Sequence, residues 1–256
     1  MGVWRWLGRV PFAAAAREQE RLRELVLRGD APETFLLCEH EPVVTLGRSA
    51  NPANVLAPRD ELARRGVQVY AASRGGDVTY HGPGQLVGYP IVRLRAGVVG
   101  HLTAMARAIA GVLRELGIDA VWRRETPGLW VGGNSAEGGS KICAFGVHVH
   151  RRVAIHGFAL NVGAALDGFD LIVPCGLAAA RTTSIAAEIG AGRSVPPLHV
   201  LASRVASALG RELDVPFEPA IESSAKPWAG FAHPAKSSAW RSHASLDAIA
   251  QHDLED

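Results

Sequence analysis

The chain has little of several residue types, and each shortage excludes a class of protein. It has only three cysteines in 256 residues, at unpatterned spacings, which argues against a disulfide-stapled secreted domain and for a reducing compartment. No apolar run approaches the roughly 20 residues that a membrane-spanning helix needs. The apolar run at residues 10–16 is short and passes directly into charged residues, unlike a secretory signal. We therefore expect a soluble, cytoplasmic protein with no membrane partner.

Positive and negative charges are also nearly balanced. The formal net charge is +2 and the arginines are scattered along the chain, so no nucleic-acid partner is expected. Neither a P-loop nor a G-x-G-x-x-G motif between a strand and a helix is present, which argues against phosphate cradles of those two kinds. With 48% hydrophobic and 20% charged residues, the chain falls in the ordinary globular range and is long enough to bury a core.

The pattern of apolar residues predicts grouped strands with a few long helices. Apolar side chains recur every three or four residues at 13–28, 101–116 and 197–213, which predicts three helices. Runs rich in β-branched and apolar residues, bounded by turn formers, predict strands. These are Thr34–Cys38, Val43–Leu46, Val67–Tyr70, Gln85–Leu94, Gly128–Val131, Ile142–Val149 and Val153–Val162. The mixture favours an α/β (α+β) fold, a mixed β-sheet flanked by helices, over regular βαβ repetition.

Composition divides the chain into two parts. Residues 1–217 carry the periodic segments and form one expected domain. Residues 218–256 are rich in Ala, Ser, His, Pro and charge, and we interpret them as a poorly ordered or loosely docked tail.

The segment from Arg74 to Pro90 reads R-G-G-D-V-T-Y-H-G-P-G-Q-L-V-G-Y-P and is the most unusual stretch. Glycines without a periodic pattern mark backbone that takes positive φ or lies close against something else. One interpretation is a tight turn into the strand that begins near Gln85. The other is a glycine floor against which a ligand lies, with Arg74 and His81 supplying polar groups. His81 could then orient a substrate carbonyl or take a proton.

A cysteine and a lysine are candidates for nucleophilic chemistry. Cys175, in I-V-P-C-G, follows a proline at a sharp turn, where a reactive thiol or a small packing residue could stand. Lys141 opens an apolar strand, and an ammonium near a thiol would favour the thiolate, while desolvation would lower the lysine pKa. On the residues alone, a lysine that extends to solvent from the strand end is the favoured alternative. Cys143 is expected on the same strand face as Lys141, as a rival nucleophile or a bystander. Cys38, in F-L-L-C-E, is expected in the core.

The remaining histidines do not predict a metal site. His148 and His150 are two apart on one predicted strand, with His156 on the next, and could chelate a metal. No carboxylate or cysteine completes a ligand set at a familiar spacing, so solvated histidines on a sheet face are the favoured interpretation and no metal is expected.

Four separated motifs give the chain a family resemblance. The glycine-rich segment is followed by S-K-I-C-A-F-G-V, I-H-G-F-A-L-N-V and I-V-P-C-G, in that order. Together they closely resemble the lipoyl(octanoyl) transferases, the octanoyl-acyl-carrier-protein:protein N-octanoyltransferases of lipoate biosynthesis. The similarity extends from the opening W-x-x-L-G-R-V to about Phe217. It implies the fold class shared by biotin and lipoate protein ligases.

The resemblance also implies a reaction and a set of site residues. An octanoyl group would pass from octanoyl-acyl carrier protein to a cysteine, and then to a lysine on lipoyl domains of 2-oxoacid dehydrogenases or on a glycine cleavage protein, without a cofactor. By position, Cys175 would carry the thioester and Lys141 would lower its pKa and move the proton. The implied substrate-binding residues are Arg74, Gly75, Gly76, Asp77, Val78, Thr79, Tyr80, His81, Ala144, Phe145, Gly146, Gly157, Phe158 and Ala159. Leu86 and Phe158 are expected to wall the acyl chain.

Two departures from the family pattern leave alternatives open. Cys143 stands where the family usually has a small, alanine-like residue, which raises the hypothesis of a protective Cys143–Cys175 disulfide. The segment A-A-A-R-T-T-S-I after Cys175 is also less typical. The alternatives to a transferase are an ATP-dependent lipoate ligase of the same fold, and a non-catalytic acyl-binding module.

Overall fold

The computed structural model describes residues 1–132, 138–163, 166–174, 181–190 and 192–220. A mixed β-sheet forms the centre, with strands in the order β12-β1-β2-β6-β10-β9-β8-β7 and β11 beside β9. Its strands are β1 (Gly2–Val10), β2 (Thr34–His40), β6 (Gln85–Arg93), β7 (Ala120–Arg123), β8 (Gly128–Val131), β9 (Ser140–His150), β10 (Val153–Asn161), β11 (Arg181–Thr182) and β12 (Phe217–Pro219). β1 runs parallel to β2 and β12, and β11 parallel to β9, while the other neighbours are antiparallel.

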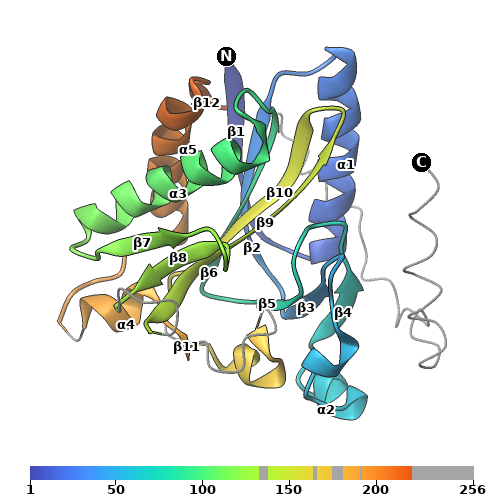
Figure 1. The fold of residues 1–256 in the computed structure, drawn as a ribbon, viewed down its shortest axis with the longest axis vertical. Coiled ribbons are helices and arrows are strands. Elements are labelled where there is room, and N and C mark those ends of the chain that lie inside the picture. Colours follow the sequence, from blue (N-terminus) through green and yellow to red (C-terminus); the bar gives the residue numbers. More distant parts are fainter. Residues whose placement is uncertain (133–137, 164–165, 175–180, 191, 221–256) are drawn as a thin grey trace. The chain divides into compact units, whose positions relative to one another are not determined.

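Helices cover both faces of this sheet (Figure 1). α1 (Phe12–Arg28) packs on β6 and β10, whereas α3 (Gly97–Glu115) and α5 (Leu198–Leu213) pack together on the other face. The main core lies on that second face, where Met105, Ile109 and Leu113 of α3 meet Leu201 and Val205 of α5 and the inward side chains of the strands. Spacings of three and four residues place these side chains on one stripe of each helix.

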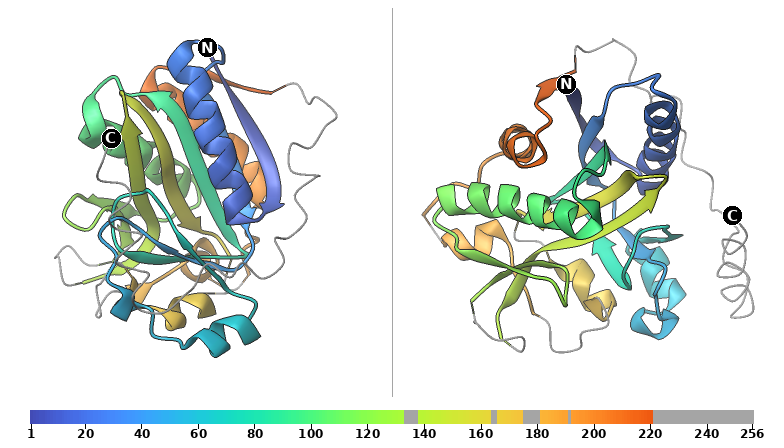
Figure 2. Two further views of the ribbon diagram at one scale, coloured as in Figure 1. Left: turned by 90° about the vertical axis from the view of Figure 1, so that its right-hand side faces the viewer. Right: turned by 45° about the horizontal axis from the view of Figure 1, so that its top comes forward.

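A second, smaller sheet has the strand order β4-β3-β5. It consists of β3 (Val43–Leu46), β4 (Gln68–Ala71) and β5 (Val78–His81), joined by the 3-10 helix η1 (Pro52–Asn54) and α2 (Arg59–Arg64). The 3-10 helix η2 (Asp167–Leu171) and α4 (Ile185–Ile189) complete the described elements. In both views of Figure 2 the small sheet and η2 lie at the same end of the molecule, where the site is built.

The predicted fold class is confirmed, and most predicted elements are present. Val43–Leu46 and Gly128–Val131 have the predicted bounds, and the three predicted helices are α1, α3 and α5. β1, β5, β7, β11 and β12 were not predicted. β12 extends past the predicted domain boundary at Phe217 to Pro219 and pairs with β1. Residues 221–256 lie outside the described residues, so the tail stays a prediction.

A β-bulge in β9 decides which side chains reach the site. Leu129 of β8 is opposite Cys143, but Trp130 is opposite Lys141, so β9 has one extra residue, Ile142. One extra residue reverses the alternation of faces. Ile142 and Cys143 are therefore both buried in the main core, and Lys141 shares the opposite face with Ala144. The expectation that Cys143 and Lys141 point to the same face is wrong for this reason.

Candidate active site

A cavity of about 400 Å³ lies on the sheet face opposite the main core. Ala144 and Gly146 of β9 and Gly157 and Ala159 of β10 form its floor. These residues are paired across the two strands, Gly157 with Gly146 and Ala159 with Ala144. Small side chains at all four positions leave room above the sheet where larger ones would fill it.

The loop that the glycine-rich motif predicts as a binding element closes this cavity from above. Gly75 donates its N–H to the carbonyl oxygen of Val147 at 3.0 Å, which attaches the loop to the free edge of β9. A Cβ atom on Gly146 would lie 3.1 Å from the Gly75 oxygen and 3.3 Å from Cδ of Arg74. The close approach of the loop therefore leaves little room for a side chain at position 146.

Arg74 holds the loop on the small sheet. Its guanidinium donates to the Thr45 carbonyl oxygen at 2.7 Å and to the Thr45 hydroxyl at 2.9 Å, and also to the Gly75 carbonyl oxygen at 3.1 Å. The side chain lines the cavity, and these bonds within the protein fix the position of the loop.

The predicted binding residues in β5 point alternately to the two sides of the strand. Thr79 and His81 line the cavity, while Val78 and Tyr80 do not, as the alternation of side chains along a strand requires. The ring of Tyr80 packs against Phe169 of η2, with a centroid distance of 5.7 Å, and Gly168 leaves the space for it. Val78 is fully buried. The structure thus gives these two side chains packing positions outside the cavity.

Lys141 lies at the end of the cavity, and a smaller hollow continues from it. This hollow is lined by Thr79, Gln85, Lys141, Ala144, Ala159, Asn161, Phe169, Pro174 and Thr182. Nζ of Lys141 lies over the ring of Trp130, 4.9 Å from its centroid. Gly128 leaves room for the lysine side chain, since a Cβ there would be 3.1 Å from Cε of Lys141. The side chain is buried and fixed by its neighbours.

Cys175 lies outside the described residues, but both flanks of its segment are described. Pro174, the preceding residue, lines the hollow that contains Lys141. On the other side, Thr182 is paired with Lys141 in the β11–β9 ladder, and Thr183 donates its N–H to the Lys141 carbonyl oxygen at 3.0 Å. The described residues on both sides of this segment therefore lie near Lys141.

A buried chain of hydrogen bonds connects His81 to this region. Gln85 donates through Nε2 to Asn161 at 2.9 Å, and Asn161 donates to the carbonyl oxygen of Thr183 at 2.9 Å. The Gln85 oxygen is therefore the acceptor for Nδ1–H of His81, at 2.7 Å. This fixes the neutral tautomer of His81 in which Nε2 keeps a lone pair.

The histidines around the cavity are neutral bases of low basicity. Burial lowers the pKa of His81 to about 3, with further lowering by His40. Burial and the nearby Arg74 lower the pKa of His156 to about 3. His40, beneath the cavity, donates to the Val10 carbonyl oxygen at 2.9 Å and accepts from the Tyr89 hydroxyl at 2.6 Å, and burial lowers its pKa to about 4. These rings act as hydrogen-bonding groups at neutral pH.

The cysteines that are described are not part of the cavity. Cys38 and Cys143 are free and fully buried, and burial raises the pKa of both thiols. Cys38 is a core residue, as predicted. Cys143 lies in the main core on the far face of the sheet, which speaks against the hypothesis of a protective disulfide with Cys175. Leu86, expected as a cavity wall, is also in the main core.

Sequence reasoning missed several cavity residues. The predicted residues that line it are Arg74, Gly75, Gly76, Asp77, Thr79, His81, Lys141, Ala144, Phe145, Gly146, Gly157, Phe158 and Ala159. Added to them are Phe12, Val87, Tyr89, Val98, Leu102, Glu125, Thr126, Pro127, Val147 and His156. His156 was interpreted as solvated, yet it is buried, with φ of 58°. Its place in the motif I-H-G-F-A-L-N-V was the available signal.

The described residues contain neither a metal-binding cluster of side chains nor a membrane-spanning helix. Within these ranges no group of three or more His, Cys, Asp or Glu side chains could hold a metal ion. No helix among them has the length and apolarity to cross a membrane.

The fold is similar to that of solved lipoate protein ligases. A putative lipoate protein ligase from T. acidophilum, solved with bound lipoic acid, superposes with a TM-score of 0.62 over 89% of this chain and 92% of that chain. The sequence identity of the pair is 15%, so this likeness concerns the fold alone.

Sequence comparisons identify the family. Residues 11–207 match the lipoyl protein ligase A/B catalytic domain. The octanoyltransferase of Myxococcus xanthus is 43% identical over 197 residues, which are 76% of this chain and 55% of that protein. The octanoyltransferase of Chloroflexus aggregans is 41% identical over 207 residues, 79% of this chain and 90% of that protein. The chain thus belongs to the lipoyl protein ligase A/B family and, within it, to the octanoyltransferases, which are acyltransferases.

Proposed function

We propose that the protein transfers an octanoyl group from octanoyl-acyl carrier protein to a lysine of lipoyl domains, through a thioester on Cys175. The observation that carries this proposal is the junction of two hollows at Lys141. The larger is a slot with a floor of glycine and alanine, and the smaller is bounded by Pro174, the residue that precedes Cys175.

The proposed chemistry has two half-reactions, each with one proton transfer. In the first, Lys141 takes the proton of the Cys175 thiol, and the thiolate attacks the carbonyl carbon of the donor thioester. The bond from that carbon to the pantetheine sulfur breaks, and this sulfur takes the proton from Lys141. In the second, the amine of the acceptor lysine attacks the Cys175 thioester. An amide forms, the Cys175 sulfur leaves, and the proton lost by the amine passes through Lys141 to that sulfur.

The cavity suits the acyl chain of this substrate. Its volume of about 400 Å³ lies in the range of roughly 300–1,000 Å³ that is typical of pockets for small organic ligands. Each methylene group buried there contributes about 0.8 kcal/mol. Exclusion of water by the loop at Arg74–Asp77 would also protect the thioester from hydrolysis. The neutral rings of His81 and His156 leave the slot without a charged imidazole at neutral pH.

Partners and location follow from the same proposal. The donor is octanoyl-acyl carrier protein, and the acceptors are lipoyl domains of 2-oxoacid dehydrogenases and the glycine cleavage protein. The cytoplasm is the proposed location, on the basis of the few, unpatterned cysteines.

Intact mass spectrometry after mixing with octanoyl-acyl carrier protein tests the proposal. We expect the mass of one octanoyl group on the wild-type protein, none on Cys175→Ala and much slower labelling of Lys141→Ala. Labelling of Cys175→Ala at the wild-type rate would refute the thioester. An ATP requirement for acylation of a lipoyl domain would instead favour the ligase, and full biological activity of Cys175→Ser would favour the non-catalytic module.

A further inference from the structure

Two segments far apart in the sequence meet around the carboxylate of Asp77. Asp77 belongs to the loop over the cavity and itself lines that cavity. Its Oδ1 accepts the backbone N–H of Asn51 at 2.8 Å, and its Oδ2 accepts the side-chain amide of Asn54. Both oxygens are thus used to hold the turn at η1. Asn51 also caps this turn, since its own side-chain oxygen accepts the N–H of Ala53 at 3.1 Å.

The same turn holds the chain that leads to Cys175. The carbonyl oxygen of Asn54 accepts the N–H of Val173 at 2.7 Å, and Val55 forms an antiparallel bridge with Ile172. Leu56 and Ala57 both donate to the carbonyl oxygen of Leu171, at 2.9 and 3.1 Å. Asn54 therefore bonds to the acyl-binding loop through its side chain and to the segment before Cys175 through its backbone.

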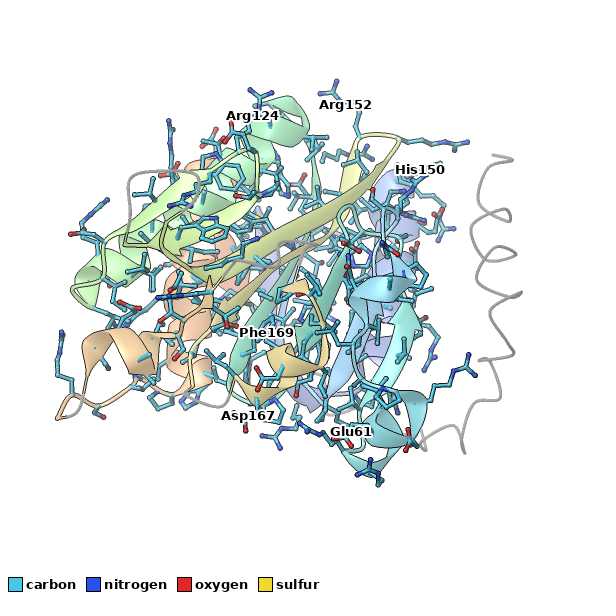
Figure 3. The ribbon with its side chains drawn as sticks, turned by 60° about the horizontal axis from the view of Figure 1, so that its bottom comes forward. Glu61, Arg124, His150, Arg152, Asp167 and Phe169 are labelled. Atoms are coloured by element: carbon cyan, nitrogen blue, oxygen red, sulfur yellow. The ribbon has the colours of Figure 1, made fainter. Side chains whose placement is uncertain are left out.

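A second contact connects the same two parts. Tyr80, which follows the loop in β5, packs its ring on Gly168 and Phe169 of η2. In Figure 3, Phe169 points inward from η2 and Asp167 outward, in agreement with their half-buried and exposed side chains. The loop and the segment are thus joined by a polar contact at Asp77 and an aromatic contact at Tyr80.

We propose that Asn54 and Asp77 are a positioning pair that couples the acyl-binding loop to the segment carrying Cys175. This inference rests on the proposed function of Cys175 and deepens it. Neither side chain reaches the Lys141 hollow, so the pair acts through Val173 and Pro174. Its effect is to hold the thiol at a fixed distance from Lys141 and from an acyl chain lying under the loop. Displacement of reacting groups by about 1 Å can cost roughly 100-fold in rate, so a small loosening of this contact is measurable.

Exchange of the two side chains provides the most discriminating test of the Asn54–Asp77 pair. In Asp77→Asn alone, the new amide must present its nitrogen either to Asn51 N–H or to the amide of Asn54, so one bond is lost. In Asn54→Asp alone, two carboxylates face each other. The double variant Asn54→Asp/Asp77→Asn reverses donor and acceptor. The amide oxygen introduced at position 77 accepts the N–H of Asn51. The amide nitrogen introduced there donates to the carboxylate introduced at position 54. Asp60→Asn is the charge control, because Asp60 is exposed on α2.

The test measures acylation, thiol ionisation and stability on the full-length chain. At saturating octanoyl-acyl carrier protein, we expect the acylation rate of Asn54→Ala, Asn54→Asp and Asp77→Asn to fall roughly 10- to 100-fold, with recovery in the double variant. The pH profile of iodoacetamide alkylation should shift to higher pH in the single variants, because the thiol moves away from the Lys141 ammonium. This reaction reports on Cys175, since Cys38 and Cys143 are buried with raised pKa values.

The outcomes separate this inference from the proposed function. Unchanged acylation and an unchanged alkylation profile in Asn54→Ala would overturn the pairing. A double variant whose acylation rate shows only the combined losses of the two single variants would overturn it as well. A fall in melting temperature without a change in the alkylation profile of the folded protein would also overturn it, because it indicates a structural contact only. Failure of the wild-type protein to become acylated would refute the proposed function, while the alkylation profiles would still decide the pairing.

Discussion

At the residue scale, the cavity depends on the absence of side chains, which makes Gly146→Ala informative. The added methyl group would meet the Gly75 oxygen at 3.1 Å and Cδ of Arg74 at 3.3 Å, so either the loop shifts or the slot narrows. Overpacking of this kind costs about 1–3 kcal/mol. We predict that kcat/KM for octanoyl transfer falls by about 5- to 150-fold, the equivalent of that cost, and that a hexanoyl donor is affected less.

Steady-state kinetics with octanoyl and hexanoyl donors of the same acyl carrier protein checks this prediction. An equal loss for both chain lengths would show that Gly146→Ala disturbs the reacting groups and leaves the acyl slot unchanged. Gly111→Ala is the matched control, since a Cβ at position 111 meets nothing within 4 Å.

The candidate site also shows at this scale what the sequence could reveal. Motif resemblance pointed to Lys141 and to many residues that line one cavity, because the spacing of several of them follows from the pairing of β9 with β10; their roles stay a prediction. It did not distinguish Thr79 and His81 from Val78 and Tyr80, since a motif does not say which strand face lines the cavity. It could not show that Asp77 bonds to Asn54, because that contact depends on how a separate loop folds back.

At the scale of elements, α3 offers a test of intrinsic helix stability. Gly111 lies in the interior of α3, where glycine costs about 0.5–1 kcal/mol relative to alanine through the entropy of the unfolded chain. Because the position is sterically open, we predict that Gly111→Ala raises the free energy of unfolding by about that amount. Urea denaturation measures this directly, and octanoyl transfer should keep its wild-type rate. A destabilised variant would show that α3 needs glycine for packing.

Elements were predictable where local pattern and final environment agree. The helices and the hairpin β9–β10 carry clear periodicity. β1 was missed because its residues Trp4, Arg5 and Trp6 are all only half-buried, so the contrast between its core-facing and outward side chains is weak. Its pairing is with β2 and β12, the second of which lies at the other end of the described chain. The bulge at Ile142 is likewise set by pairing with β8, which a single strand's sequence does not specify.

At the scale of the whole molecule, buried histidines make stability depend on pH. Burial lowers the pKa of His40 and His101 to about 4 and of His81 and His156 to about 3. An unfolded chain has histidine pKa values of about 6.5. Below that pH the unfolded state binds protons that the folded state does not, so stability is full above pH 6.5 and is lost as the pH falls toward 3–4. Each histidine contributes up to about 1.4 kcal/mol per pH unit in this window.

His101 offers a test of this pH dependence, because it is not among the residues that line the cavity, although its neighbour Leu102 is. Among the described residues, neither of its ring nitrogens has a hydrogen-bond partner, and its side chain is buried in α3. We predict that His101→Leu reduces the stability lost between pH 7 and pH 5 by about 2 kcal/mol, as measured by urea denaturation at each pH. His150→Gln, at an exposed position on β9 (Figure 3), should keep the wild-type dependence. The same loss in His101→Leu as in the wild type would mean that His101 is protonated equally in the folded and unfolded states, and that acid acts on the remaining buried histidines and on carboxylates.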